Sequence, residues 1–346
     1  MKRRVGSIDG YGKGLCQEVD TPELKAGEVR VAVRASMISP GTELGSLRNL
    51  RANPEAERKA RIFGYTNAGV VEEVGEGVEQ FEVDQRVACM GGGYALHTDI
   101  ALVPQNLCVA LPDEVSFEEG SSVHLAATAL HAIRRSAPVF GENGMVMGLG
   151  LVGQMSAQFG QLSGCHMMGV DRFPRRLEAA RQAGIEAVVQ AEVEDPVARA
   201  EEVTQGYGMD FGVIAFGGDG TAAFEQIYAS LKQAPDRHKM GRIVIVGGAR
   251  IAHQFASGLG NVDVRSAART GPGYHDGAYE YGGDYPPVFV EWPTQRNMAE
   301  CMRAIAAGRL KVSPLITHEF ELERIGEAVD ILVEEPEKAL GVVLKP

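Results

Sequence analysis

Three glycines near the middle of the chain, Gly148, Gly150 and Gly153, stand at the spacing G-x-G-x-x-G. An apolar run over 145–147 precedes them and a run of small residues follows. In a strand–turn–helix unit, the first glycine permits a tight turn, the second lets the backbone approach a pyrophosphate, and the third lets helix and strand pack closely. The N-terminus of the following helix offers N–H donors to phosphate groups. The sequence therefore predicts a dinucleotide-binding turn.

An acidic residue at the expected distance supports this interpretation. A second apolar run, 166–170, ends in Asp171. A carboxylate at the end of the second strand accepts hydrogen bonds from the adenine ribose hydroxyls and repels the 2′-phosphate of NADP. Arg172 and Arg176 follow it, and basic side chains there would pair with that phosphate instead. We expect NAD as the cofactor, with NADP as the alternative.

Composition limits the remaining possibilities. The chain has 346 residues, enough for about two domains, and a net charge of −12, which argues against a nucleic-acid surface. No run approaches the roughly 18 apolar residues of a membrane span, and the basic start lacks the apolar region of a signal peptide. The five cysteines are scattered and odd in number, which suits reduced thiols. We expect a cytoplasmic protein that binds a small-molecule substrate and neither nucleic acid nor membrane.

The pattern of apolar residues divides the chain into three parts. The first 135 or so residues read as β-rich, with strands at 29–34, 68–75 and 85–90, and a helix follows over 116–136 with Ser116 as its N-cap. The middle alternates buried strands with helices, which predicts a parallel, doubly wound sheet. Residues 271–293 form a long loop, and the tail returns as a helix, a strand, a helix and a strand between 295 and 344.

This order of parts resembles the medium-chain dehydrogenase/reductase superfamily. The motifs that carry the resemblance are Ser39-Pro-Gly-Thr-Glu43, Gly64-Tyr-Thr-Asn-Ala-Gly-Val-Val71, Val74-Gly-Glu-Gly-Val78, the 148–153 turn, and Pro314-Leu-Ile-Thr-His-Glu-Phe-Glu-Leu322. The resemblance implies an α/β fold, in which a Rossmann doubly wound parallel sheet joins a β-rich GroES-like catalytic domain. It places the catalytic domain at 1–135, the dinucleotide-binding domain at 136–290 and the return to the catalytic domain at 291–346. It also implies a homodimer or homotetramer.

The chain departs from the zinc alcohol dehydrogenases of that superfamily at two of three ligand positions. Those enzymes carry C-G-[ST]-D, then G-H-E, then a third ligand four residues before a helix threonine. Here Pro40 replaces the cysteine, Tyr65 and Thr66 replace the His-Glu pair, and His124 stands four residues before Thr128. Zinc needs about three protein ligands, so we expect no zinc and no other metal.

Without a metal, a protein group must take the proton when a hydride leaves carbon. The resemblance maps Thr42, Tyr65 and His124 to the site, with Glu43 beside them. His124 is our first choice for acid or base, since histidine titrates near neutrality. Alternatively His124 is a core histidine, Tyr65 fills space, and Glu43 makes a structural ion pair.

Further candidates surround these groups. The expected cofactor contacts, besides the three glycines, Asp171, Arg172 and Arg176, are Leu151, Val152, Thr128, Gly217, Gly247 and Arg269. The long loop supplies Tyr274, His275, Tyr279 and Asp284, which either line the substrate site or form an oligomer contact.

Narrower motifs, such as Gly271-Pro-Gly-Tyr-His-Asp276 and Trp292-x-x-x-Arg296, resemble a zinc-free subgroup associated with sugar oxidoreductases. The leading hypothesis is therefore a metal-independent, NAD-dependent oxidoreductase acting on an alcohol or ketone of a sugar, sugar derivative or cyclitol. The alternatives are a zinc-free quinone or enoyl reductase using NADPH, and a non-catalytic nucleotide-binding redox sensor.

Overall fold

The computed structural model describes residues 1–253 and 256–346. The chain divides into two compact units: unit 1 is Met1–Ala127 with Thr270–Pro346, and unit 2 is Thr128–Arg269. The chain thus returns to unit 1 at Thr270, earlier than the expected residue 291. The reason is that the long loop packs on unit 1, where the Asn106 amide donates to the carbonyls of Tyr279 and Gly283 at 2.6 and 2.9 Å.

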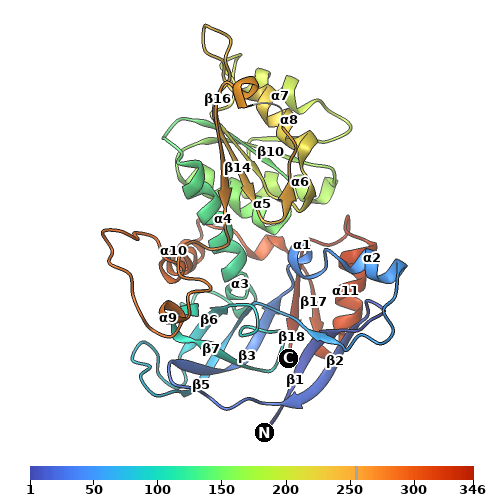
Figure 1. Ribbon diagram of the computed structural model, residues 1–346, viewed down its shortest axis with the longest axis vertical. Coiled ribbons are helices and arrows are strands. Elements are labelled where there is room, and N and C mark those ends of the chain that lie inside the picture. The colour runs from blue at the N-terminus through green and yellow to red at the C-terminus, as the bar shows by residue number, and fades with distance from the viewer. Residues whose placement is uncertain (254–255) are drawn as a thin grey trace. The chain divides into compact units, whose positions relative to one another are not determined.

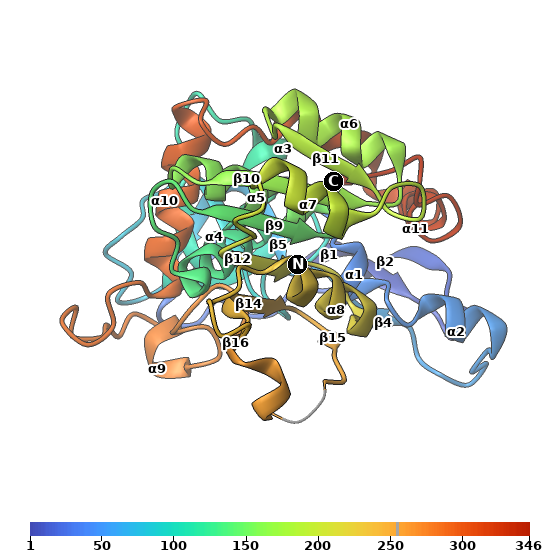
Figure 2. The same ribbon diagram turned by 90° about the horizontal axis from the view of Figure 1, so that it is seen from above.

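Unit 2 contains a six-stranded sheet in which every neighbouring pair of strands is parallel. Its strands are β9 (Asn143–Met147), β10 (His166–Asp171), β11 (Ala187–Gln190), β12 (Phe211–Ile214), β14 (Met240–Val246) and β16 (Asn261–Ala267). Their spatial order is β11-β10-β9-β12-β14-β16, which can be followed from top to bottom in Figure 2. This is the order 3-2-1-4-5-6 of a dinucleotide-binding sheet, and it confirms the predicted fold class.

Helices cover this sheet as the alternating pattern predicts. They are α5 (Leu151–Leu162), α6 (Pro174–Ala183), α7 (Pro196–Val203) and α8 (Thr221–Ser230). Helix α5 contacts β9 and β10, while α8 contacts β12 and β14. The short strands β13 (Gly218–Asp219) and β15 (Ala249–Arg250) pair separately, and a 3-10 turn follows at Ala256–Leu259.

Unit 1 is built largely on antiparallel β-structure, shown mainly in blue and red in Figure 1. Its larger sheet has the order β17-β18-β3-β5-β6-β8, with β7 paired to β3. These strands are β3 (Glu28–Met37), β5 (Thr66–Val74), β6 (Arg86–Met90), β7 (Ile100–Pro104), β8 (Cys108–Ala110), β17 (Ile316–Glu321) and β18 (Gly341–Lys345). A smaller sheet joins β1 (Lys2–Ile8), β2 (Gly14–Asp20) and β4 (Arg61–Ile62).

Short helices connect the strands of unit 1. They are α1 (Pro40–Glu43), α2 (Leu47–Ala52), α3 (Phe117–Gly120), α9 (Gly277–Glu280), α10 (Thr294–Ala306) and α11 (Ile325–Glu334), with 3-10 turns at Gln105–Leu107, Ser313–Leu315 and Leu322–Arg324. Helix α4 (Val123–Ser136) begins in unit 1 and ends in unit 2. In the described residues, no helix is long and apolar enough to cross a bilayer.

The helix expected over 116–136 is two helices, α3 and α4. Ser116 caps α3 through a capping box with Glu119, which confirms the predicted start. The hydroxyls of Ser121 and Ser122 then donate to the carbonyls of Glu118 and Glu119, each at 2.7 Å. These side-chain bonds compete with the helical pattern, so the chain turns before α4 begins.

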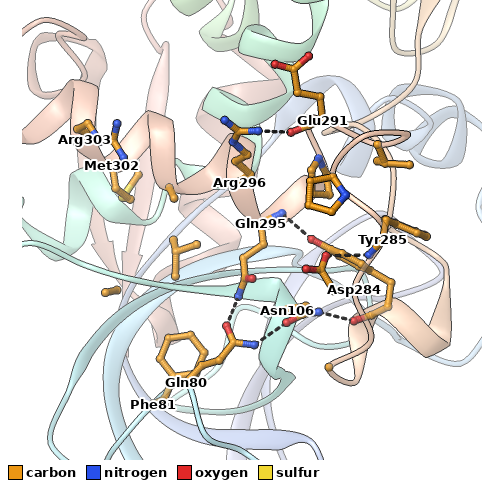
Figure 3. Close-up of a pocket in the computed structure, with 18 of the residues that line it drawn as sticks. Gln80, Phe81, Asn106, Asp284, Tyr285, Glu291, Gln295, Arg296, Met302 and Arg303 are labelled. Atoms are coloured by element: carbon orange, nitrogen blue, oxygen red, sulfur yellow. Dashed lines mark hydrogen bonds between the residues drawn. The ribbon is translucent and has the colours of Figure 1, made fainter.

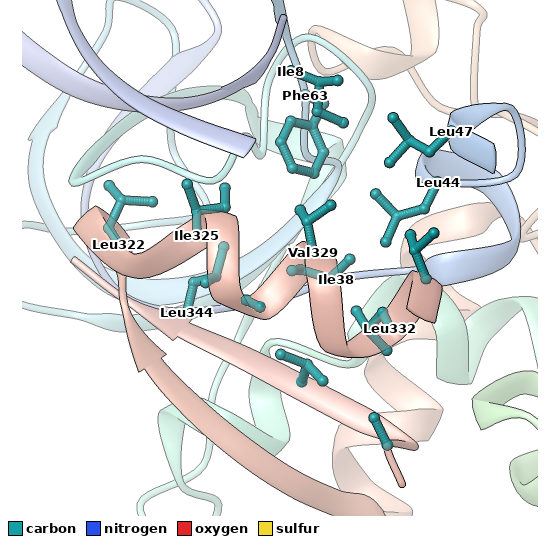
Figure 4. Packing of buried hydrophobic residues seen from close by; sticks show 14 of the residues in the cluster. Ile8, Ile38, Leu44, Leu47, Phe63, Leu322, Ile325, Val329, Leu332 and Leu344 are labelled. Carbon is teal, nitrogen blue, oxygen red and sulfur yellow. The ribbon is translucent and has the colours of Figure 1, made fainter. Parts of the chain in front are cut away.

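One hydrophobic cluster of unit 1 fixes the segments that carry the candidate site. The apolar face of α11 packs against residues flanking α1 and against Phe63, as Figure 4 shows. Ile38 and Leu44 lie on either side of α1 and are 0% and 5% exposed, and Phe63 is 3% exposed. Tyr65 follows Phe63 by two residues. The cluster therefore holds both α1 and the segment that carries Tyr65.

We expect Ile325→Ala to lower the free energy of unfolding by about 2–5 kcal/mol, because Ile325 is wholly buried in this cluster and its removal leaves a cavity. Urea denaturation measures the loss. The matched control is Ile331→Ala on the same helix, where the side chain is only partly buried and the loss should be smaller. Equal losses would show that the cluster does not govern stability in this unit.

Candidate functional site

The site in unit 1 begins with the short helix α1. Pro40 occupies the first position of this helix, where proline is favoured because no N–H is needed. It stands at the position of the cysteine ligand in zinc alcohol dehydrogenases. Ser39 precedes it at the N-cap position. The Ser39 hydroxyl serves a different purpose from capping, since both Ser39 and Thr42 hydrogen-bond the Tyr65 side chain. Helix α1 therefore presents two hydroxyls to one phenol.

A glycine-only turn places Tyr65. Gly64 has φ +122°, a conformation that favours glycine, and a Cβ added there would overlap the backbone N–H of His97. The Tyr65 carbonyl also accepts a hydrogen bond from Gly91 N–H at 2.9 Å. Tyr65 is thus tied through its backbone to the segment that carries His97.

The environment of Tyr65 keeps its phenol protonated. Burial raises the pKa of Tyr65 most, and the negative charge of Glu43 raises it further. The hydrogen bonds from Ser39 and Thr42 oppose this and lower the pKa, but less strongly. At neutral pH the phenol is consequently a hydrogen-bond donor, which suits a group that faces a carbonyl or alkoxide oxygen.

His124 lies at the start of α4 against Tyr65, and it is 7% exposed. Its Nδ1 is 3.3 Å from the Tyr65 carbonyl oxygen. Because a carbonyl only accepts, Nδ1 carries the hydrogen in this bond, and the neutral ring then has its lone pair on Nε2. The two rings are 4.4 Å apart between centroids. The structure therefore brings together the predicted Tyr65 and His124.

Thr66 has a structural task. Its side chain is fully buried, and its hydroxyl donates to the Ser121 carbonyl at 2.7 Å and accepts from His124 N–H at 3.4 Å. Thr66 thereby holds the start of α4 and the position of His124.

Glu43, whose charge acts on Tyr65, forms a buried pair with His97. Glu43 is 4% exposed, and its Oε2 accepts from Ser39 N–H at 2.6 Å. Its Oε1 is 3.3 Å from His97 Nε2. No sequence motif surrounds His97, so sequence reasoning missed it. The only local signal is Gly64, which requires a close neighbour but does not identify it.

Two of the four loop residues proposed for substrate reach this cluster. The Tyr274 hydroxyl accepts from Gly92 N–H at 2.7 Å, and the Tyr274 ring lies 5.5 Å from that of His124. His275 stacks on Tyr274 at 3.9 Å and has φ +72°, a strained conformation for a residue with a side chain. Its backbone is held by Glu280, which accepts from His275 N–H at 2.7 Å.

The other two, Tyr279 and Asp284, line a cavity of about 920 Å³ whose lining does not include His124, Tyr65 or Tyr274. Figure 3 shows its polar side chains bonded to one another: Gln80 donates to Asn106, and Gln295 donates to Gln80. The Tyr279 hydroxyl accepts from Gln295 N–H, and burial raises the Tyr279 pKa to about 12. Tyr279 therefore anchors the loop, and only Tyr274 and His275 lie near the candidate acid and base.

The residues present do not fit a zinc ion. Among residues 1–253 and 256–346, no group of three or more His, Cys, Asp and Glu side chains is placed to hold a metal. At the positions in question stand a proline, a phenol with a raised pKa and one imidazole. Such a set lacks the three nitrogen, sulfur or carboxylate donors that zinc takes from proteins.

In unit 2 the glycine turn has the geometry of a phosphate-binding loop. Gly148 has φ +91°, and a Cβ on Gly153 would overlap the Gly148 carbonyl. A Cβ on Gly150 would meet nothing within 4 Å. Gly150 is the N-cap of α5, and in the part of the chain described here no side chain caps that end. Its N–H groups, including those of Leu151 and Val152, thus remain suited to a phosphate.

Asp171 holds this turn from the next strand. It is 5% exposed, with Oδ2 accepting from Leu149 N–H at 2.7 Å and Oδ1 accepting from Phe173 N–H at 2.9 Å. Arg176 lies 3.5 Å from the same carboxylate, so this predicted phosphate partner is paired with the acid. Arg172 stacks over the Phe173 ring at 4.6 Å.

The remaining cofactor candidates lie at the ends of elements in unit 2. Gly217 and Gly247 come after β12 and β14, at the carboxyl edge of the sheet, and a Cβ on either would meet nothing within 4 Å. Ligands of such sheets bind at that edge. Thr128 lies on α4, and Arg269 ends the unit with φ +56°.

Comparisons with known proteins agree with both units. A family model described as an alcohol dehydrogenase GroES-like domain matches residues 25–113, and one described as a zinc-binding dehydrogenase matches 152–272. A sorbitol dehydrogenase of Arabidopsis thaliana is 26% identical over 86% of this chain and 83% of its own.

Two solved structures have the same fold. An Escherichia coli oxidoreductase of unknown specificity has TM-score 0.81 at 21% identity, covering 100% of this chain and 99% of its own. An Escherichia coli alcohol dehydrogenase solved with NADH has TM-score 0.76 at 18% identity, with the same coverage.

Gly153→Ala and Gly150→Ala should separate the two tasks of the turn. Gly153→Ala should lower the melting temperature, because its Cβ would overlap the Gly148 carbonyl. Gly150→Ala should keep the melting temperature and weaken NADH binding, because its Cβ would enter open space beside the helix N-terminus. Thermal unfolding and NADH fluorescence titration measure the two effects. Normal NADH affinity in Gly150→Ala would show that this turn does not bind the phosphates of the cofactor.

Proposed function

The chain belongs to the medium-chain dehydrogenase/reductase superfamily and is an oxidoreductase. We propose that it transfers a hydride between NAD(H) and an alcohol or ketone of a sugar, polyol or cyclitol, and that it does so without a metal ion. The observation that carries this proposal is the cluster of Tyr65, His124 and Tyr274 at the place where zinc ligands would be required. The sorbitol dehydrogenase relative supports the substrate class.

The residues of unit 2 fit a dinucleotide. When bound, the nicotinamide ring accepts or supplies the hydride. The uncapped N-terminus of α5 and the open space at Gly150 would take the pyrophosphate. Asp171 would accept from the ribose hydroxyls with the lone pairs that Leu149 and Phe173 leave over, since each carboxylate oxygen has two.

The residues of unit 1 supply what a zinc ion otherwise would. Tyr65 donates a hydrogen bond to the reacting oxygen, because its raised pKa keeps the phenol protonated. His124 takes the proton at Nε2 during alcohol oxidation, because the Tyr65 carbonyl holds the hydrogen on Nδ1. Thr42, which is exposed and bonded to Tyr65, offers a hydroxyl that links the phenol to solvent.

NADH should bind more tightly than NADPH. The physical reason is the buried Asp171 carboxylate, whose charge repels a 2′-phosphate, together with the pairing of Arg176 to that carboxylate. Titration of nicotinamide fluorescence with each cofactor measures this. Tighter binding of NADPH would reject the assignment and favour a reductase of activated double bonds.

His124→Ala should lower kcat for polyol oxidation by about 10²- to 10⁴-fold, the usual contribution of a general acid or base. NADH affinity should stay nearly unchanged, since His124 is absent from the glycine turn. The control is His166→Ala, an exposed residue on β10 outside both sites. A His124→Ala enzyme with normal kcat and a lower melting temperature would make His124 a core residue. Tyr65→Phe, tested in parallel, shows whether the phenol is the stronger contributor.

A further inference from the structure

A buried carboxylate and a buried imidazole lie directly behind Tyr65. Glu43 and His97 are 4% and 0% exposed, and Oε1 of one is 3.3 Å from Nε2 of the other. Among the described residues, neither of these two atoms has a hydrogen-bond partner. A buried carboxylate is costly unless an opposite charge or a donor compensates it. His97 is placed to compensate Glu43.

The surroundings of His97 hold its ring toward Glu43. Its Nδ1 is 2.9 Å from the Ser36 hydroxyl, and its ring stands edge-on to Phe63 with centroids 4.8 Å apart. Its backbone donates to the Phe63 carbonyl at 3.2 Å and accepts from Gly6 N–H at 2.7 Å. The imidazole is fixed from both ends, so Nε2 has one direction in which to act.

Ser39 links this pair to the phenol. Its N–H donates to Glu43 Oε2 at 2.6 Å, and its side chain hydrogen-bonds Tyr65. The Glu43 charge also acts on Tyr65 through space and favours the phenol over the phenolate. A change at Glu43 therefore reaches Tyr65 by two routes, one geometric and one electrostatic.

We propose that Glu43 and His97 form one buried ion pair that positions Ser39 and tunes proton donation by Tyr65, which makes His97 a positioning residue of this active site. The proposal rests on the proposed function, in which Tyr65 donates to the reacting oxygen. Glu43 holds the proton on the phenol, and the Nε2 edge of the His97 ring, 3.3 Å from Glu43 Oε1, offsets part of the carboxylate charge. The two residues thus act on Tyr65 in opposite directions.

Other charged and titratable groups nearby leave this assignment intact. Arg61 donates to the backbone carbonyl of Glu43 at 3.2 Å, not to its carboxylate. Asp99, close to His97 in sequence, is paired with Arg4 at 3.1 Å. His124 and Tyr274 flank the Tyr65 cluster. The titratable group that faces the Glu43 carboxylate is therefore His97.

The test is the pH profile of kcat/KM for ketone reduction, followed from about pH 6 to the most alkaline pH at which the enzyme stays folded, because the pKa of Tyr65 is raised above the ordinary value of tyrosine. Glu43→Gln keeps an oxygen for Ser39 N–H and removes the charge. Its basic limb should move to lower pH, with a roughly tenfold rate loss above the limb for each unit moved. In His97→Gln the limb should not move to lower pH, and the double variant should follow Glu43→Gln. An unmoved limb in Glu43→Gln, or a downward shift in both single variants, overturns the proposal.

Glu28→Gln is the matched control, because Glu28 is also a buried carboxylate but acts on a different tyrosine, Tyr281, whose hydroxyl donates to it at 3.0 Å. It should leave the limb in place, and a shift there equal to that of Glu43→Gln would count against the proposal.

A second readout does not need turnover. Alkaline titration of tyrosinate absorbance, taken as the difference between each protein and its Tyr65→Phe counterpart, reports the phenol directly. It should show Tyr65 ionising at lower pH in Glu43→Gln, and it decides the matter if His97→Gln fails to fold. Shifted absorbance in a protein that oxidises no sugar or polyol would sink the proposed function alone. Normal turnover with unshifted absorbance would sink the ion-pair role alone.

Discussion

The close approach of Gly64 to the backbone of His97 is the contact on which the site in unit 1 depends. Any side chain at Gly64 would overlap His97, and its φ of +122° suits glycine alone. This contact places Phe63 in the hydrophobic cluster and Tyr65 at the edge of the site. It also brings His97 within reach of Glu43. The lack of a side chain at Gly64 thus sets the positions of Tyr65 and of the Glu43–His97 pair.

Both units hold their reactive turn in the same manner, with a carboxylate that accepts from a backbone N–H. Glu43 binds Ser39 N–H beside the phenol, and Asp171 binds Leu149 N–H within the glycine turn. A charged acceptor makes such a bond short and strong, and burial protects it from competing water. These acids therefore do structural work at the positions where their chemistry is also needed.

Local signals in the sequence predicted much of this structure. The 148–153 turn, the parallel sheet of unit 2 and the N-cap at Ser116 follow from spacing and residue type. Pairings between distant segments did not follow. His97 meets Glu43 across 54 residues of sequence, where the backbone of His97 packs on Gly64. Tyr279 lines a cavity without His124, because Asn106 and Gln295 hold its loop there. Side-chain bonds of Ser121 and Ser122 divided the single helix expected over 116–136.

We propose that protein groups replace the metal in unit 1, with a phenol as donor and an imidazole as base. Metal analysis of the purified enzyme during polyol oxidation, before and after treatment with a strong chelator, tests it most directly. We expect well under one zinc per chain and a kcat that the chelator leaves unchanged. About one zinc per chain, with activity lost to the chelator and restored by added zinc, would contradict it, since a catalytic zinc keeps about three protein ligands that this site does not offer.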